Sequence, residues 1–459
     1  MLIIDNALRE RERRKTPLRV GMVGAGEMAK GMINQISRHT PGMTVAATYS
    51  RTAEKALLAY EVAGITDFVV TDDAAVADKV IMAGKSVITS DINLLIDLKL
   101  LDVLVESTGS IEFGADTMIK AFNAGRSVLS FNAELDSIFG PILKHKAHKA
   151  GVRYSLGDGD QPGVTMNLHR YVTGLGFEPL LCGNIKGLQD HYRTPDTQRS
   201  FAEKWGMNPE MATNFADGTK ISFEQACIAN ATGMKVAKRG MLGYSSADHV
   251  DNLTRLYDVD ELRSLGGIVD YVVGAKPGPG VFIYATISDP LAAKYLKYGK
   301  LGNGPLYSFY VPYHLLFFDI ASSICRLVDF NDPTIVAREG PVVDVVAAAK
   351  TDLQPGERLD GIGGFKTYGV CENHPVARSE RLLPMALTEG CRVTRGVRKD
   401  EVLSWDHVEI ASERFVDRLL EEQNILFNGQ RELRPQKPRL PTSALSLSEE
   451  STEKSYSLP

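Results

Sequence analysis

The strongest constraint on the fold lies near the start of the chain, in the segment VGMVGAGEMAKG at residues 20–31. The apolar run LRVGMV at residues 18–23 has the composition of a buried strand, and Gly24 and Gly26 end it. Residues 27–39 then place apolar side chains at helical spacing. This order of strand, glycine turn and helix predicts the first unit of a parallel α/β sheet.

Similar apolar runs recur over the next hundred residues. They lie at 43–50, 86–90, 102–108, 126–131 and 152–156, and a helix is expected at 113–125. Strands that alternate with helices form βαβ units in a parallel sheet. We therefore expect an α/β protein whose residues 16–157 form a doubly wound, Rossmann-type domain.

The pattern changes after the turn GDGDQPG, which begins at Gly157. Residues 158–340 mix strands, helices and polar loops, which predicts an α+β substrate or catalytic domain. Residues 341–412 read as short strands and turns, and the turns at 354–357 and 398–401 belong to a weak internal repeat. A small all-β module is therefore expected at 341–412.

The two ends of the chain differ from its body. Residues 1–15 are apolar and then charged, so we expect a leader helix packed on the first domain rather than a signal peptide. Residues 413–430 are expected to form a helical extension. Residues 431–459 are rich in Pro, Ser, Glu and Lys, which predicts a disordered tail.

Composition narrows the class of protein. A net charge of -5 over 459 residues does not predict a nucleic-acid surface, and no apolar stretch is long enough to span a membrane. The five cysteines contain no CxxC pair, which is typical of reduced thiols in a cytoplasmic protein. We expect a cytoplasmic protein whose partner is a small-molecule substrate, with a homodimer as the default assembly.

The glycine turn has the spacing of a dinucleotide-binding site. Gly24 allows the tight turn, Gly26 lets the backbone approach a pyrophosphate, and Ala29 lets the helix pack on the strand. Glu27 and Met28 lie in the same turn, so we expect them to contact the cofactor too. The helix N-terminus would favour the phosphate charge.

The end of the second strand favours NADP(H) over NAD(H). NAD-preferring folds carry an acidic residue there, whereas this chain has Ser50, Arg51 and Thr52. Two hydroxyls and a guanidinium suit a ribose 2′-phosphate. The alternative is that Arg51 is an ordinary surface residue.

Residues at the ends of later strands are expected to meet the rest of the cofactor. Thr108 and Gly109 follow one strand, and Asn132 follows the next. All three are predicted to lie near the ribose and nicotinamide, because ligands bind at the carboxyl edge of such sheets. Glu134 follows closely and could face either the substrate or solvent.

Three polar side chains mark the turn that leaves the first domain. Asp158, Asp160 and Gln161 could orient substrate hydroxyls or hold a hard divalent cation such as Mg or Mn. Asp and Gly are also favoured in solvated turns, which is the alternative. The sequence leaves the need for a metal open.

Two lysines are candidates for proton transfer. Lys220 lies in NFADGTK, three residues after Asp217, which is a further catalytic candidate, and Lys186 lies in GNIKGLQDHYRTP. A lysine buried in a cleft shifts its pKa readily and can protonate a carbonyl oxygen as hydride arrives. Spacing alone does not choose between Lys186 and Lys220.

Other polar residues are candidates for holding the substrate. Asn214 belongs to the same loop as Lys220, and Arg193 and Arg239 are candidate anion or phosphate holders. A lone histidine such as His314 in VPYHL is more often structural.

These motifs together resemble a known group of enzymes. The segments VGMVGAGEMAKG, GDGDQPG, NFADGTK, ANATGM, YVPYHL and LDGIGGFKTYG, with LLPMALTEGCRVTRGVRKDEVLSW, are similar to those of homoserine-dehydrogenase-like oxidoreductases with a C-terminal SAF domain. Within that group the chain resembles the deoxyxylulose-phosphate reductoisomerase-like proteins, over nearly its whole length apart from the leader and tail. The resemblance implies a SAF (β-clip-like) module at 341–412.

The resemblance also implies a reaction. This is the NADPH-dependent isomerisation and reduction of 1-deoxy-D-xylulose 5-phosphate to 2-C-methyl-D-erythritol 4-phosphate, in isoprenoid precursor synthesis. Asp158, Asp160 and Glu134 would hold the hydroxyls and carbonyl, through a cation if one binds. The phosphate would be held by Arg193, Lys220 or Arg239.

One segment, SFNAELD, differs from the pattern of homoserine dehydrogenases, and other activities therefore stay possible. SFNAELD aligns with a position that reads Asn-Lys in homoserine dehydrogenases; Asn132 matches, but Ala133 and Glu134 replace the lysine. This argues against homoserine dehydrogenase activity. The alternatives are a dehydrogenase of another small polyol, hydroxy acid or sugar derivative, and an NADP(H)-binding sensor without turnover.

Overall fold

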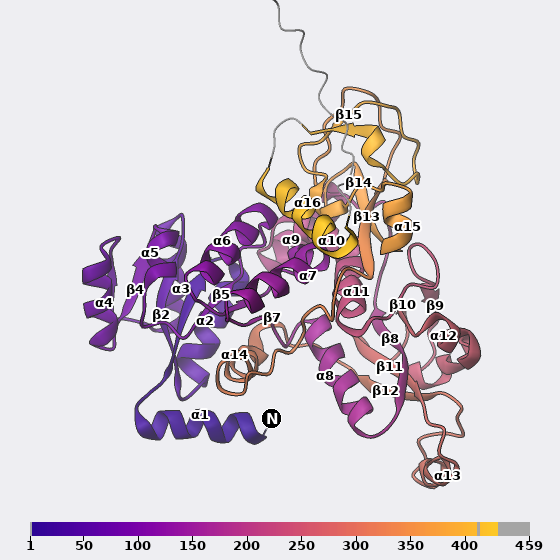
Figure 1. The fold of residues 1–459 in the computed structure, drawn as a ribbon, viewed down its shortest axis with the longest axis horizontal. Helices are drawn as coiled ribbons and strands as arrows, with labels where there is room; N and C mark the ends of the chain where they lie inside the picture. Colours follow the sequence, from indigo (N-terminus) through magenta and orange to yellow (C-terminus); the bar gives the residue numbers. More distant parts are fainter. Residues whose placement is uncertain (1, 411–413, 430–459) are drawn as a thin grey trace, which may run out of the picture.

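The structure is a computed structural model that describes residues 2–410 and 414–429. Figure 1 shows the N-terminal α/β part on the left, a second mixed part at the lower right and a small β-rich part at the upper right. Within these ranges no helix has the length and apolar character needed to cross a membrane.

The N-terminal part is built on a seven-stranded sheet in the order β3-β4-β2-β1-β5-β6-β7, with every neighbouring pair parallel. Its strands are β1 (Leu18–Val23), β2 (Met43–Tyr49), β3 (Phe68–Val70), β4 (Ser86–Thr89), β5 (Val103–Glu106), β6 (Val128–Ser130) and β7 (Tyr154–Leu156). Val20 and Met22 of β1 face one core cluster, and Val23 faces another. The sheet is therefore buried on both faces, which explains its almost continuously apolar strands.

Helices cover both faces of this sheet. In the N-terminal part they are α1 (Leu2–Arg14), α2 (Glu27–His39), α3 (Ala53–Ala63), α4 (Ala74–Met82), α5 (Ile92–Asp97), α6 (Ile111–Asn123) and α7 (Ala133–Lys149). Helices α2 and α3 share one cluster with α14, a helix that comes much later in the chain. Helices α4 to α7 contribute to the other cluster.

The second part contains a mixed five-stranded sheet in the order β12-β11-β8-β10-β9. Its strands are β8 (Glu178–Lys186), β9 (Tyr244–Ser245), β10 (Ile268–Val273), β11 (Gly280–Thr286) and β12 (Tyr307–Val311). Strands β8, β9 and β10 run parallel, whereas β11 and β12 join antiparallel. The helices of this part are α8 (Gln161–Gly174), α9 (Pro195–Trp205), α10 (Pro209–Ala216), α11 (Thr219–Thr232), α12 (Val259–Leu265), α13 (Pro290–Tyr298), α14 (Ile320–Asp329) and the 3₁₀ helices η1 (Val250–Leu256) and η2 (Leu316–Asp319).

Helix α11 connects the three parts. It packs on α7 of the first part, on α8 and β10 of the second, and on β13 (Val343–Ala349) and β14 (Thr367–Asn373) of the third. The start of the helix is fixed by Gly218, at φ +89°, and by Asp217, whose Oδ1 accepts a hydrogen bond of 2.9 Å from the Thr219 backbone N–H. This start brings Lys220 into the first turn, beside the first sheet.

The C-terminal part holds two antiparallel strand pairs, β13 with β14 and β15 (Arg392–Val393) with β16 (Val408–Glu409). The remaining elements are α15 (His374–Ser379), η3 (Met385–Leu387), η4 (Trp405–His407) and α16 (Phe415–Asn428). The repeated turns close in the same way. The Gln354 backbone N–H donates to Glu357 Oε1 at 2.9 Å, and that of Arg398 donates to Glu401 Oε2 at 3.1 Å.

The predicted fold class is confirmed: an α/β protein with a parallel Rossmann-like sheet, a second mixed α/β part and small antiparallel strand pairs near the C-terminus. The SAF assignment and the domain boundaries stay predictions. The predicted disordered tail at 431–459 lies outside the described residues, as does residue 430 at the end of the predicted helical extension. Residues 411–413, where the predicted β module meets that extension, also lie outside them.

Candidate active site

The glycine turn between β1 and α2 has the geometry that the dinucleotide spacing requires. Gly24 has φ +107°, and a Cβ there would lie 3.3 Å from Thr108 Cγ2. A Cβ on Gly26, at the N-terminus of α2, would meet no atom within 4 Å, so the space in front of the helix is open to a ligand. Ala29 is fully buried. These residues fit a dinucleotide pyrophosphate at the helix N-terminus.

At the end of β2, one of the three predicted residues is already engaged. Ser50 is buried, and its hydroxyl donates to the Thr52 carbonyl at 2.7 Å. Arg51 and Thr52 are exposed. Over the ranges that the structure covers, the Arg51 guanidinium makes no hydrogen bond or ion pair, so it is available to a ligand.

The strand ends nearer the middle of the sheet are held together by Glu106. This buried carboxylate accepts hydrogen bonds from the Thr108 N–H at 2.8 Å and from the Ser130 hydroxyl at 3.2 Å, and burial raises its pKa. Asn132 accepts from the Leu135 N–H at 3.1 Å and donates to the Ser110 carbonyl at 3.3 Å. Its side chain therefore caps α7 and braces the strand ends, instead of pointing to a ligand.

The main polar site lies where β6 and β7 end, against the start of α11. Lys220 Nζ is 3.3 Å from Glu134 Oε1 in the first turn of α7, and 3.8 Å from Oδ2 of Asp160, the N-cap of α8. Asn214 of α10 donates to Glu134 Oε1 at 3.0 Å. One ammonium group thus joins carboxylates from two neighbouring strand ends.

Two more side chains extend this group on the Asp160 side. His314 Nδ1 lies 3.8 Å from Asp160 Oδ1, and its Nε2 is 3.3 Å from Gln161 Nε2. Burial lowers the pKa of His314, although Asp160 opposes this, so the ring favours its neutral form. Here we call the six residues the lysine–carboxylate cluster: Glu134, Asp160, Gln161, Asn214, Lys220 and His314.

Several buried polar atoms in and beside the cluster have no hydrogen-bond partner within the described part of the chain. They are Gln161 Oε1, Asn214 Oδ1, His314 Nδ1 and, one turn after Lys220 on α11, Glu224 Oε2. Buried polar groups in proteins are nearly always paired, and exceptions concentrate where a ligand or water binds. The three oxygens among them are unused acceptors that a hydroxylated substrate would fill.

The pKa values of the two candidate lysines are shifted in opposite directions. For Lys220, burial lowers the pKa, but the carboxylates of Glu134, Asp160 and Glu224 outweigh it, so the net pKa is raised. For Lys186, at the end of β8, burial dominates and Lys220 adds repulsion, so the pKa is lowered despite Glu224. Lys220 stays charged, whereas Lys186 can exchange a proton more readily.

Four predicted residues lie outside the cluster with partners of their own. Asp158 is buried against Arg326 at 3.3 Å, and Asp217 is buried against Lys350 at 2.8 Å. Arg193 pairs with Asp190, and Arg239 pairs with Glu372 and Glu380. The structure thus brings Lys220, Asp160, Glu134, Gln161 and Asn214 together, with Lys186 beside them, and leaves these four elsewhere.

The carboxylates do not form a cation site. Asp158 faces Arg326, whereas Asp160 and Glu134 face Lys220. Over residues 2–410 and 414–429, no group of three or more His, Cys, Asp or Glu side chains could hold a metal ion. The residues present do not fit a divalent cation, and we assign no step to one.

Two residues of the site were not predicted from the sequence. Glu224 follows Lys220 by four residues, which places both on one side of α11; that spacing could have indicated it. His314 was given a structural role because it stands alone in its segment. Only the fold brings it to Asp160, more than 150 residues away in the chain.

Comparison with known proteins adds a family match to this geometry. Residues 159–320 match the family described as the catalytic domain of the oxidoreductase DRL. The matched segment contains Asp160, Lys186, Lys220, Glu224 and His314. This match supports an oxidoreductase, and it covers the part of the chain that supplies most of the site.

Some solved dehydrogenase structures are also similar. The scyllo-inositol dehydrogenase from Lactobacillus casei, with NAD(H) and scyllo-inositol bound, is 11% identical at a TM-score of 0.39, over 70% of this chain and 92% of that one. The WlbA dehydrogenase from Bordetella pertussis, in complex with NADH and UDP-GlcNAcA, is 15% identical at a TM-score of 0.31. The match covers 64% of this chain and 70% of that one. At scores this low the similarities carry no argument about this chain. No curated protein matches it.

Proposed function

We propose that this chain is an NADP(H)-dependent oxidoreductase that reduces the carbonyl group of a small polar substrate at the lysine–carboxylate cluster. The observation that carries the proposal is Lys220, held between Glu134 and Asp160 at the carboxyl edge of the parallel sheet. This edge is where doubly wound folds bind their ligands. A sensor without turnover would not need a second polar site of this kind.

The cofactor assignment is supported by the glycine turn and by Arg51. The open space at Gly26 suits the pyrophosphate, and the exposed Arg51 at the end of β2 suits a 2′-phosphate. When bound, NADPH supplies the hydride that reduces the carbonyl carbon.

The two lysines take different roles. As the carbonyl carbon accepts hydride, the electron pair of its π bond moves to oxygen, and Lys186 donates the proton that completes the alcohol. Lys220 keeps its charge and stabilises the negative charge that develops on that oxygen. Lys186 then recovers a proton from water. In the reverse direction the same lysine accepts the proton.

The cluster amides position the substrate. Asn214 Oδ1 and Gln161 Oε1 are buried acceptors without partners, so each can accept a hydrogen bond from a substrate hydroxyl. Both amides are held in place, by Glu134 and His314 respectively. A substrate with two neighbouring hydroxyls fits this arrangement.

The specific reaction we propose is the conversion of 1-deoxy-D-xylulose 5-phosphate to 2-C-methyl-D-erythritol 4-phosphate, by isomerisation and reduction. The family match and the resemblance of the motifs support it. The test is NADPH oxidation by the purified protein with this substrate, with NADH in parallel and with and without Mg²⁺. Turnover that prefers NADPH supports the proposal. Absence of turnover in both conditions, with cofactor binding demonstrated, would remove this reaction.

A second candidate is a dehydrogenase of another small polyol, hydroxy acid or sugar derivative. It is favoured by two of the three predicted phosphate holders, since Arg193 and Arg239 are already paired with carboxylates. A substrate without phosphate would not need them. NADP⁺ reduction with a panel of polyols and hydroxy acids tests this candidate, and it would be rejected if only the sugar phosphate reacts.

A further inference from the structure

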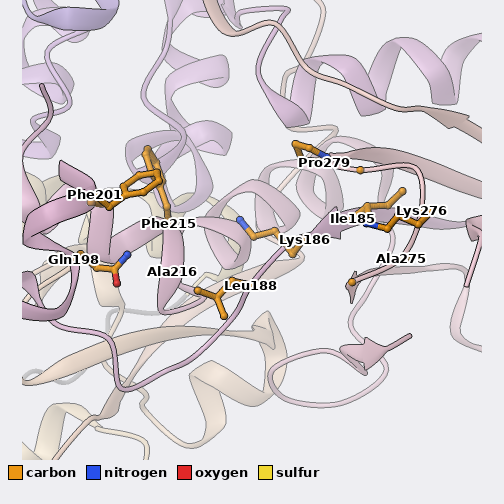
Figure 2. Close-up of a pocket in the computed structure, with 14 residues that line it drawn as sticks. Ile185, Lys186, Leu188, Gln198, Phe201, Phe215, Ala216, Ala275, Lys276 and Pro279 are labelled. Carbon is orange, nitrogen blue, oxygen red and sulfur yellow. The ribbon is translucent and has the colours of Figure 1, made fainter. Parts of the chain in front are cut away.

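A pocket of about 590 Å³ lies next to the lysine–carboxylate cluster and shares none of its six residues. Figure 2 shows it between the end of β8, the helices α9 and α10, and the loop that follows β10. This volume is in the range of small-molecule binding sites.

The walls of the pocket are mostly apolar. They include Ile185 and Leu188 on the β8 side, Phe201 of α9, Phe215 of α10 and Pro279 of the loop. In Figure 2, Phe201 and Phe215 both lie at the left end of the drawn residues. A pair of aromatic rings favours a flat or branched apolar group, because stacking and burial both contribute.

One cationic group projects into this apolar space. In Figure 2, the Lys186 side chain extends from the end of β8 towards Phe215. Its ammonium has no hydrogen bond or ion pair to any residue that the structure describes. A second lysine, Lys276, lies at the exposed side of the pocket. An anion is the partner that a partly buried, unpaired ammonium favours.

We propose that this pocket binds an organic anion with an apolar body, its carboxylate, sulfonate or phosphate at Lys186 and its apolar part against Phe201 and Phe215. The geometry argues against two simpler ligands. An inorganic anion would leave the aromatic walls unused, and an uncharged hydrocarbon would leave Lys186 unpaired. Lys186 is also the proton donor of the proposed reaction, but the inference is tested by binding, without turnover, so the two proposals can fail separately.

The probe is 8-anilinonaphthalene-1-sulfonate, followed by fluorescence in the presence of saturating NADP⁺ so that the cofactor cleft is filled. Binding of its uncharged analogue N-phenyl-1-naphthylamine measures the contribution of the apolar walls. Competition by sulfate measures the contribution of the negative charge alone. We expect one saturable sulfonate site. Lys186→Met should weaken sulfonate binding about tenfold, the effect of losing one charge-assisted hydrogen bond, and should change binding of the uncharged analogue less than about twofold.

Phe201→Ala should weaken the binding of both probes. Because Phe201 is half exposed, we expect this variant to fold, so it tests the apolar wall even if Lys186→Met does not fold. Lys294→Met, an exposed lysine on α13, is the matched control and should change neither. The proposal is overturned if Phe201→Ala leaves sulfonate binding unchanged, if a folded Lys186→Met affects both probes equally, or if sulfate binds as tightly as the sulfonate.

Discussion

Lys220 Nζ lies 3.3 Å from Glu134 Oε1, and this contact joins the first turn of α11 to the first turn of α7. Both side chains are largely buried, and Asn214 fixes the carboxylate from a third helix. A buried carboxylate is stable only when a cation or hydrogen bonds compensate for its lost hydration. The same pair therefore holds two parts of the fold together and sets the charge of the candidate active site.

Replacing Lys220 should show how far the stability of the protein depends on this ion pair. Lys220→Met leaves Glu134 and Asp160 without their shared partner, and we expect the free energy of unfolding to fall by about 3 kcal/mol. Adding Glu134→Gln removes one uncompensated charge and should restore part of the loss. Urea unfolding of the two variants measures both effects, with Lys294→Met as a control. Equal stability of Lys220→Met and the wild type would contradict the paired-charge description.

The lowered pKa of Lys186 predicts how the rate of reduction depends on pH. The protonated lysine is the donor, so kcat/KM should fall as pH rises through its pKa, below the ordinary lysine value of about 10. Lys186→Arg should be slower but should lose this alkaline decrease, because arginine stays protonated. The check is a pH–rate profile of both proteins. An unchanged alkaline limb in the arginine variant would assign the proton to another group.

Glu224 should make stability depend on pH. Burial, reinforced by Asp160, raises its pKa from 4.5 to about 8 in the folded protein, against the opposing charges of Lys220 and Lys186. The folded state then binds a proton that the unfolded state has lost, so this contribution to stability is present below pH 4.5 and disappears as pH rises to about 8.

Glu224→Gln removes the titrating group and should flatten this decrease. We expect the wild type to lose up to about 4 kcal/mol relative to the variant between these two pH values. Unfolding measured across the range tests it, with the exposed Glu203→Gln as the matched control. Parallel curves for wild type and Glu224→Gln would show that Glu224 has the same pKa in both states.

Arg51 should determine the choice between the two nicotinamide cofactors. Arg51→Ala is expected to weaken NADPH binding about tenfold and to leave NADH binding nearly unchanged, because only NADPH carries the 2′-phosphate. Lys55→Ala, a nearby exposed lysine on α3, is the control. Calorimetric titration with both cofactors gives the comparison. An equal loss for both cofactors would place Arg51 against the adenine or outside the site.

Local sequence patterns predicted much of the parallel sheet. The apolar runs at 43–50 and 86–90 became β2 and β4, because buried parallel strands are continuously apolar. Strand β3 has three residues, one of them exposed, so it carries no comparable signal. Short edge strands are set by pairing with a neighbour, which a local pattern does not contain.

The site residues also differ in whether a local sequence pattern or a contact between distant segments reveals their role. Asp160 and Lys220 were predicted from turn motifs, and the fold brings them together. Asp158 looked equivalent to Asp160, but it turns towards Arg326, which lies more than 160 residues later and whose role depends on where α14 packs. Glu224 gains its importance from burial between two lysines, and burial depends on the whole fold.

The proposed function is tested most directly by following hydride transfer from NADPH to the substrate. NADPH deuterated at the transferred position is incubated with 1-deoxy-D-xylulose 5-phosphate and the wild-type or Lys186→Met protein, and the product is analysed by mass spectrometry. We predict deuterium in the wild-type product and about a hundredfold slower transfer in the variant, with NADPH binding retained. Transfer at the wild-type rate by Lys186→Met would contradict it.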